Sequence, residues 1–178
     1  MGSESRTRRR GWAALLAGAA IVTTFSGCAG LGGYSNETLF PDDVHSVRLE
    51  MFDNRSFRRG VEYELSDALA KRIETETPYK IVSSQDRTDS VISGQLVSIS
   101  ESALTIEREI AEPLEKEVVL TAVVTWKDLN TGRLMINSRR VTAAASYSEF
   151  QNQDFTYASA LAANKLAQRI VELMESNW

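Results

Sequence analysis

Residues 117–126 read EVVLTAVVTW, the clearest strand pattern in the chain. Alternate positions fall into two sets, which are Val118, Leu120, Ala122, Val124 and Trp126 on one side and Val119, Thr121, Val123 and Thr125 on the other. A period of two predicts a strand whose two faces carry these two sets. The other strands are predicted before and after this one in the sequence.

Further strands are predicted on both sides of it. Residues 128–132 contain Asn130 and Gly132, which tolerate positive φ, and predict a hairpin turn followed by a returning strand over 133–142. Upstream, a β-branched run predicts a long strand from about Ser90 that bends near residues 100–102 and continues to Ile110. Residues 111–114 then turn the chain back. Two more strands are predicted over 44–51 and 79–82.

Two helices complete the prediction. The first begins at Gly60 and ends at Thr77-Pro78, with one apolar face made of Val61, Leu65, Ala68, Leu69 and Ile73. The second runs from Asp154 to Met174, where apolar residues recur at helical spacing. The order strand, helix, four strands, helix predicts an α+β fold. It is a two-layer sandwich with two helices packed on one face of a mixed four- to five-stranded sheet.

The first 28 residues are typical of a bacterial lipoprotein signal. Arg6 and residues 8–10 are basic, residues 11–25 are apolar, and Ser26-Gly27-Cys28 resembles a lipobox. About fifteen apolar residues are too few for a membrane span but suit an export signal. Cys28 is the only cysteine, so a lipidated N-terminus is favoured over the alternative of a secretory signal followed by a free thiol. Export by the Sec or the twin-arginine route stays open.

These features divide the chain into a signal peptide (1–27), a lipidated cysteine with a flexible tether (28–40) and a single α+β domain (41–178). Ala29, rather than aspartate, follows the cysteine and favours delivery to the outer membrane, facing the periplasm. Without residues 1–27 the chain keeps 16 basic and 23 acidic residues, a formal charge of −7. This charge argues against nucleic acid as a partner.

The sequence contains no pattern that predicts catalysis, a cofactor or a metal. His45 is the single histidine, and its neighbours do not supply a set of metal ligands or a catalytic triad. Five acidic residues near the predicted hairpin are more consistent with a solvated rim than with a glycosidase pair: Glu107, Glu109, Glu112, Glu115 and Glu117. We therefore expect a binding protein and not an enzyme.

Basic residues form two groups in the sequence, Arg55, Arg58 and Arg59 after the first strand, and Lys127, Arg133, Arg139 and Arg140 around the last hairpin. Lys127 and Arg133 flank the predicted turn, so we expect them to lie close together. Two cations at the end of a sheet suit a phosphorylated or carboxylated ligand. Ordinary surface charge is the alternative.

The mature chain resembles the LptE family of lipopolysaccharide-assembly lipoproteins over roughly residues 33–178. The resemblance rests on Gly33-Tyr34 after the cysteine, the strand and Asn-containing turn at 47–56, the helix start at 65–69, and the closing helix at 158–178. It implies two helices on a four-stranded sheet. It also implies a plug inside the outer-membrane β-barrel LptD and a role in delivering lipopolysaccharide to the outer leaflet.

In such a plug, Lys127 and Arg133 become the candidate contacts for lipopolysaccharide phosphates. The polar residues 146–153 are a candidate part of the surface that meets the barrel, or simply a loop before the last helix. A different class also begins with a strand, an Asn-containing turn and a helix. This alternative is a periplasmic regulatory or secretion-pore lipoprotein, such as an activator of a cell-wall synthase or a curli-type pore subunit.

Overall fold

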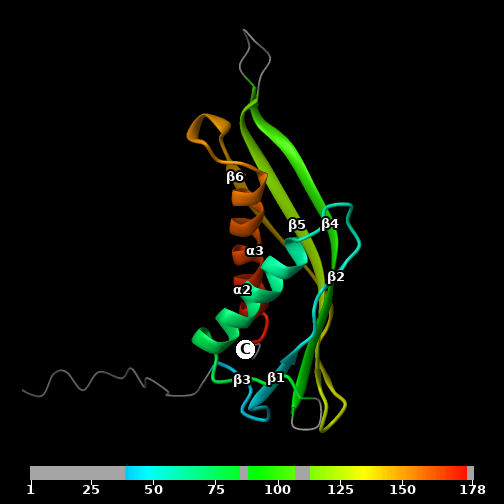
Figure 1. Ribbon diagram of the computed structural model, residues 1–178. Coiled ribbons are helices and arrows are strands. Elements are labelled where there is room, and N and C mark those ends of the chain that lie inside the picture. Colours follow the sequence, from blue (N-terminus) through cyan, green and yellow to red (C-terminus); the bar gives the residue numbers. More distant parts are fainter. Residues whose placement is uncertain (1–38, 85–87, 107–112, 176–178) are drawn as a thin grey trace, which may run out of the picture. The chain divides into compact units, whose positions relative to one another are not determined.

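A six-stranded sheet with two long helices on one side forms the domain in the computed structural model, which describes residues 39–84, 88–106 and 113–175 (Figure 1). The elements in chain order are β1 (Ser46–Leu49), β2 (Asp53–Asn54), α2 (Val61–Glu76), β3 (Lys80–Ile81), β4 (Ser90–Ile106), β5 (Pro113–Asp128), β6 (Leu134–Tyr147), the 3₁₀ turn η3 (Glu149–Gln151) and α3 (Phe155–Glu172). The predicted α+β sandwich is confirmed. None of the helices in the described ranges is long and apolar enough to span a membrane.

The sheet is mixed, with strand order β3-β1-β4-β5-β6. β1 runs parallel to β3 and β4, whereas β4, β5 and β6 form an antiparallel meander joined by hairpins. β2 pairs with β4 just beyond β1, so both short strands lie along the same side of β4. The amide of Glu50 donates to the Ile92 carbonyl at 2.9 Å, and the amide of Arg55 donates to the Leu96 carbonyl at 3.0 Å.

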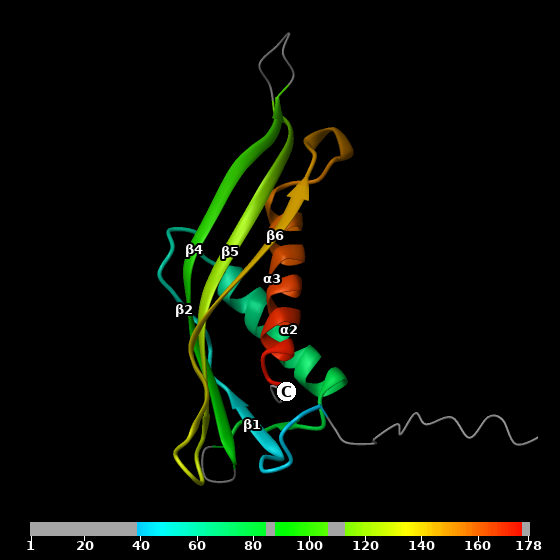
Figure 2. The same cartoon turned by 180° about the vertical axis from the view of Figure 1, so that it is seen from behind.

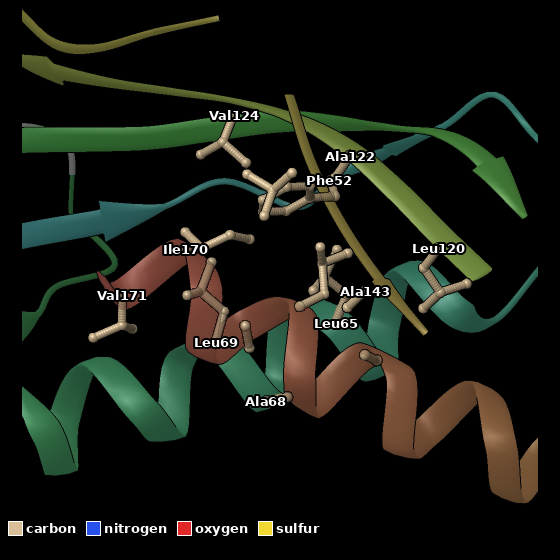
Figure 3. Packing of buried hydrophobic residues seen from close by; sticks show 14 of the residues in the cluster. Phe52, Leu65, Ala68, Leu69, Leu120, Ala122, Val124, Ala143, Ile170 and Val171 are labelled. Atoms are coloured by element: carbon tan, nitrogen blue, oxygen red, sulfur yellow. The ribbon is translucent and has the colours of Figure 1, made fainter. Parts of the chain in front are cut away.

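The core lies between the sheet and the two helices (Figure 3). On β5 the residues that face the helices are the fully buried set beginning with Val118 and ending with Trp126. α2 contributes a stripe at helical spacing, as predicted from the sequence. α3 contributes a wider stripe that is rich in alanine, and Ala143 and Ala145 of β6 face it. Small residues on both partners allow the helix to approach β6 closely.

Gly94 is the one position in β4 where a side chain would not fit. The Phe52 ring packs directly on its backbone, and an added Cβ would lie 2.7 Å from the Val123 carbonyl oxygen. Phe52 is buried and follows β1, so this contact fixes how the chain passes from β1 to β2. A glycine inside a strand often marks such a close approach.

Three details differ from the sequence prediction. Pro113 and Leu114, predicted in a turn, begin β5. Asp53 and Asn54, predicted as part of a turn, form β2. Ser146 and Tyr147, predicted in a polar loop, belong to β6, which continues because Tyr147 is buried in alternation with Ala143 and Ala145. The signal, Cys28 and most of the tether lie outside the described residues, as do Glu107, Glu109 and Glu112.

Candidate functional site

The described residues offer binding surfaces and not a metal centre. Within 39–84, 88–106 and 113–175, no group of three or more His, Cys, Asp or Glu side chains is placed to hold a metal ion. His45 is exposed at the start of β1, where its backbone amide donates to the Asp89 carboxylate at 3.1 Å and its carbonyl accepts from Lys80. The surfaces of interest are the uncovered face of the sheet and its rims.

The sheet face opposite the helices, here called the bare face, carries mostly polar side chains. Cross-strand partners lie on the same face of a sheet, so the register identifies its rows. From one end to the other, these rows are Val91–Lys127–Leu134, Ser93–Thr125, Gln95–Val123–Arg140, Ser98–Thr121–Thr142, Ser100–Val119–Ala144 and Ser102–Glu117–Ser146. Both helices lie on the other side of the sheet (Figures 1 and 2).

Small hydroxyl groups dominate this face and leave it able to form many hydrogen bonds. Among the described residues of this face, Thr121 and Thr142 are the only two whose hydroxyl groups are hydrogen-bonded to each other, at 3.2 Å. A shallow groove of about 350 Å³ crosses the face near β1 and β2. It is lined by Glu50, Met51, Asp53, Ser93, Gly94, Gln95, Val123, Thr125 and Ser138.

Ser138 shapes this groove through a β-bulge. The register of β5 and β6 shifts between Val124 and Trp126, and Ser138 adopts a φ of 45° in the left-handed region. Non-glycine residues adopt this conformation only when the surrounding structure holds them there. The bulge thus interrupts the regular row of side chains beside Thr125.

At the end of the sheet near the β5–β6 turn, two carboxylates accept several hydrogen bonds. Asp89 accepts from the Ser46 hydroxyl at 2.8 Å and from two backbone amides of β1 and its approach, and these bonds lower its pKa below the ordinary value. In the β5–β6 turn, Asp128 accepts from the hydroxyl and amide of Thr131 and the amide of Asn130. These bonds, led by the Thr131 hydroxyl, lower the pKa of Asp128.

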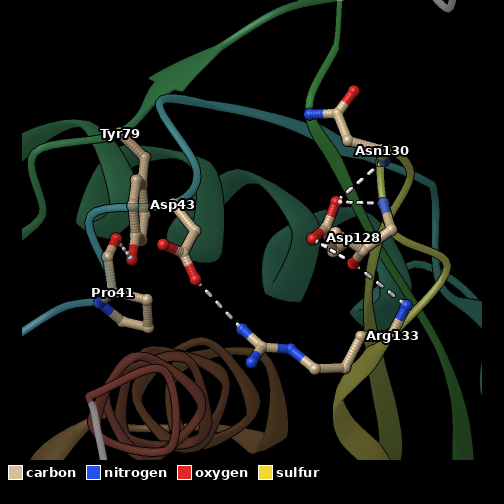
Figure 4. A network of polar contacts seen from close by, with 7 residues as sticks. Pro41, Asp43, Tyr79, Asp128, Asn130 and Arg133 are labelled. Carbon is tan, nitrogen blue, oxygen red and sulfur yellow. Dashed lines mark hydrogen bonds and ion pairs between the residues drawn. The ribbon is translucent and has the colours of Figure 1, made fainter.

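Lys127 and Arg133 sit near this turn but extend to different sides. The amide of Asp128 pairs with the Arg133 carbonyl at 2.9 Å, so Lys127 lies opposite Leu134 and points to the bare face. The Arg133 guanidinium instead reaches Asp43 at 3.4 Å, as Figure 4 shows. Arg133 also lines a groove with Trp126 and Met174 on the helix side. The structure therefore does not bring the two cations together into one clamp.

The other basic residues are only partly engaged. Arg58 donates to Glu101 of β4 at 2.7 Å and stacks over the Phe155 ring, with its carbon Cζ 3.7 Å from the ring centre. This arginine therefore has a structural role. Arg139 and Arg140 are exposed on β6, and Arg140 belongs to the bare face.

A second, polar hollow of about 480 Å³ lies at the upper end of β6. It is lined by Glu115, Ser146, Tyr147, Ser148, Gln151, Gln153 and Tyr157. The Tyr147 hydroxyl donates to Glu101, and burial together with this carboxylate raises the pKa of Tyr147 to about 12. The same bond lowers the pKa of Glu101. Much of the predicted polar segment 146–153 thus forms the wall of this hollow.

The loop that joins β2 to α2 is organised by Asn54, the asparagine of the turn that the sequence predicts at the end of residues 47–56. Asn54 accepts from the amide of Ser56 at 2.8 Å and donates to the Arg58 carbonyl at 2.7 Å and to Glu62 at 2.6 Å. The pKa of Glu62 is lowered overall. Burial acts to raise it, but the hydrogen bonds from Asn54 and from the backbone amides of Glu62 and Gly60 together have the larger effect. An Asn followed two residues later by Ser is typical of such a turn.

Several solved structures share this fold at low sequence identity. The hypothetical protein CT253 from Chlamydia trachomatis is similar with a TM-score of 0.53 and 10% identity, over 72% of this chain and 94% of that one. The uncharacterized lipoprotein B from Nitrosomonas europaea is similar with a TM-score of 0.50 and 15% identity, over 74% of this chain and 81% of that one. These two likenesses show the fold alone. The PelC dodecamer from Paraburkholderia phytofirmans has a TM-score of 0.49 at 10% identity, over 78% of this chain and 96% of that one, and supports no inference.

The sequence itself identifies the family. A search among curated proteins finds no match. The family model described as "LptE: Lipopolysaccharide-assembly" matches residues 44–176, which includes every described helix and strand from β1 to α3. Because this match covers most of the chain and the fold has two helices on one face of a mixed sheet, the chain belongs to the LptE family of lipopolysaccharide assembly.

Proposed function

We propose that this chain is an outer-membrane lipoprotein that serves as plug and assembly partner of an LptD-type β-barrel and assists the insertion of lipopolysaccharide into the outer leaflet. The observation that carries the proposal is the bare face of the sheet. Its six rows present mainly serine, threonine and glutamine side chains and no covering helix among the described residues. Family membership supports the same reading.

The chemistry of this face suits the inside of a barrel. The lumen of an outer-membrane barrel is polar, and short hydroxyl side chains can exchange hydrogen bonds with it without large desolvation of charge. Most side chains on this face are short, so a partner could meet it over several strands.

The anchor is the second part of the proposal. We infer that Cys28 carries the lipid and that the domain is held at the inner side of the outer membrane. Lipid chains contribute about 0.8 kcal/mol for each buried methylene group, so several chains anchor a protein stably. The barrel assembles in the same membrane, and the anchor would keep the domain close to it.

Direct contact with lipopolysaccharide is the third part. Lys127 on the bare face and Arg133 on the helix side are the candidate contacts for lipid phosphates. Since their side chains extend to different sides, each would act separately. Lys127 has no ion-pair partner among the described residues, whereas Arg133 forms an ion pair with Asp43.

Affinity purification of the tagged, full-length protein from its own membranes tests the proposal. Recovery of one large β-barrel in a stoichiometric amount is the expected result. Recovery of a cell-wall synthase instead, or of a ring made only of copies of this chain, would overturn it. A Cys28→Ser variant is the matched control for anchoring. It should no longer incorporate labelled palmitate and should yield much less barrel.

A further inference from the structure

β6 forms one complete edge of the described sheet. It is the last strand in the order β3-β1-β4-β5-β6 and is 14 residues long. Successive residues of an antiparallel strand direct their backbone groups alternately to its two sides. Every second residue of β6 therefore turns its N–H and C=O groups away from β5. Such an edge is a template on which another chain can add a strand.

The two halves of this edge differ in how far their own residues oppose strand addition. In the lower half, Arg139 and Arg140 are exposed, and the bulge at Ser138, with its φ of 45°, interrupts the register. Charges and bulges both discourage pairing at an edge. The upper half, residues 141–147, reads VTAAASY and contains no charge, no proline and no glycine. Extended segments of this composition pair readily with one another when their edge is free.

α3 supplies the upper half with the charges that it lacks. The helix lies beside β6 in both views of the fold (Figures 1 and 2). The Lys165 ammonium donates to the Ala144 carbonyl at 3.2 Å, and the Arg169 guanidinium donates to the Thr142 carbonyl. These carbonyls are two residues apart, so they point to the same side of the strand. Both acceptors on the outer side of this uncharged segment are thus occupied by cations.

The spacing of the two donors matches the spacing of the two acceptors. Lys165 and Arg169 are four residues apart on α3, which corresponds to a rise of about 6 Å. Two residues along a strand cover between about 6 and 7 Å. A single helical turn can therefore serve two successive outward carbonyls. Hydrogen bonds from charged donors are also stronger than those between neutral groups.

We propose that Lys165 and Arg169 form an autoinhibitory cap that prevents β6 from pairing with β6 of a second copy of this chain. Two identical edges can pair antiparallel around a two-fold axis, and the uncharged segment 141–147 would lie at the centre of that pairing. The second strand would need the carbonyls that the two cations occupy. It would also have to enter the space beside β6 that their side chains fill. The inference does not depend on the barrel partner, so it can fail while the proposed function holds.

Removing both cations tests the cap. Sedimentation of the full-length lipoprotein in detergent should show that Lys165→Ala with Arg169→Ala lowers the dissociation constant for self-association at least about tenfold relative to the wild-type protein. The matched control is Asn164→Ala with Gln168→Ala, since these neighbouring side chains bond only within α3. It should behave as the wild-type protein does. Lys165→Arg with Arg169→Lys keeps two cations and should also prevent association.

Amide hydrogen exchange locates the association. The outward amides of Thr142 and Ala144 should become at least about tenfold more protected when the concentration of the double alanine variant is raised. Three results would overturn the inference. They are a variant that associates no more than the wild-type protein, association that leaves these two amides unprotected, and equal association by the control.

A measurement on the wild-type protein covers the case in which the double variant fails to fold. A peptide with the sequence of residues 139–147 is added to the full-length protein, and exchange at Thr142 and Ala144 is followed again. The capped edge should leave both amides as exchangeable as without peptide. Protection of these amides by the peptide would show that β6 is open in the wild-type protein and would overturn the inference.

Discussion

The two faces of the β4–β5–β6 sheet come from the same strands but have different surroundings. One face carries Leu120, Val124 and Trp126, all buried beneath α2 and α3. The other carries Val119, Val123 and Thr125, which remain half-buried with no helix above them among the described elements. The difference shows that alternation alone does not decide which face is covered. The helices pack on the face with the larger side chains, and no helix of the described elements covers the other face.

The largest effect is expected from shortening a side chain on the helix face. Leu120→Ala should lower the free energy of unfolding by about 3 kcal/mol, because it removes buried methyl groups and leaves a cavity. Val119→Ala, one residue away on the bare face, should cost less than about 1 kcal/mol. Urea unfolding of both variants measures the contrast. Equal losses would show that the bare face is as tightly packed as the helix face.

The next largest effect concerns the closest contact across the helix side of β4. Gly94→Ala should lower the free energy of unfolding by about 2 kcal/mol, because the added methyl group would overlap the Phe52 ring and approach the Val123 carbonyl. Thermal unfolding checks the value. A double variant with Phe52→Leu, which opens space at the same point, should recover part of the loss. Non-additive effects of this kind are the mark of direct contact.

A smaller effect of about 1 kcal/mol is expected from Asp89→Asn, since the carboxylate accepts three hydrogen bonds from His45 and Ser46. Its pKa is lowered in the folded protein, so its contribution is present above the ordinary aspartate value of 3.8 and is lost as the pH falls through the folded-state value. Unfolding measured from pH 7 to pH 2 should therefore show the two proteins converging at the acid end. A constant difference at every pH would contradict this assignment.

The smallest effects on folding are expected at the two candidate lipid contacts. Arg133→Gln and Lys127→Gln should each change the free energy of unfolding by less than about 0.5 kcal/mol, because the Arg133–Asp43 pair is largely exposed at 59% and 72%. Binding of purified lipopolysaccharide to the full-length variants is the informative measurement. Weaker binding by each variant alone would support two separate contacts. Unchanged binding by the double variant would remove both residues from the site.

The sequence predicted the helix face well because apolar periodicity reports burial directly. The two helices, the long hairpin and the returning strand all lie where their patterns indicate. The extra length of β6 was missed because Ala143 and Ala145 are too small to give a clear pattern. Their burial comes from the approach of α3, which is a tertiary effect.

The surface features were harder to predict because they depend on register and distant partners. Lys127 and Arg133 flank one turn, but pairing of Asp128 with Arg133 sends their side chains to different sides. The loop after β2 is likewise held by a hydrogen bond between Asn54 and Glu62, which are eight residues apart in the sequence.

The proposed function requires that the bare face, and not the outer surface of the helices, meets the barrel. Recovery of the barrel with tagged full-length protein tests it most directly when two matched double variants are compared. Thr125→Glu with Thr142→Glu places two carboxylates on the bare face. Thr75→Glu with Thr156→Glu places two on the exposed surface of α2 and α3. The first pair should reduce barrel recovery at least about tenfold and the second should leave it unchanged. The reverse result would contradict the claim.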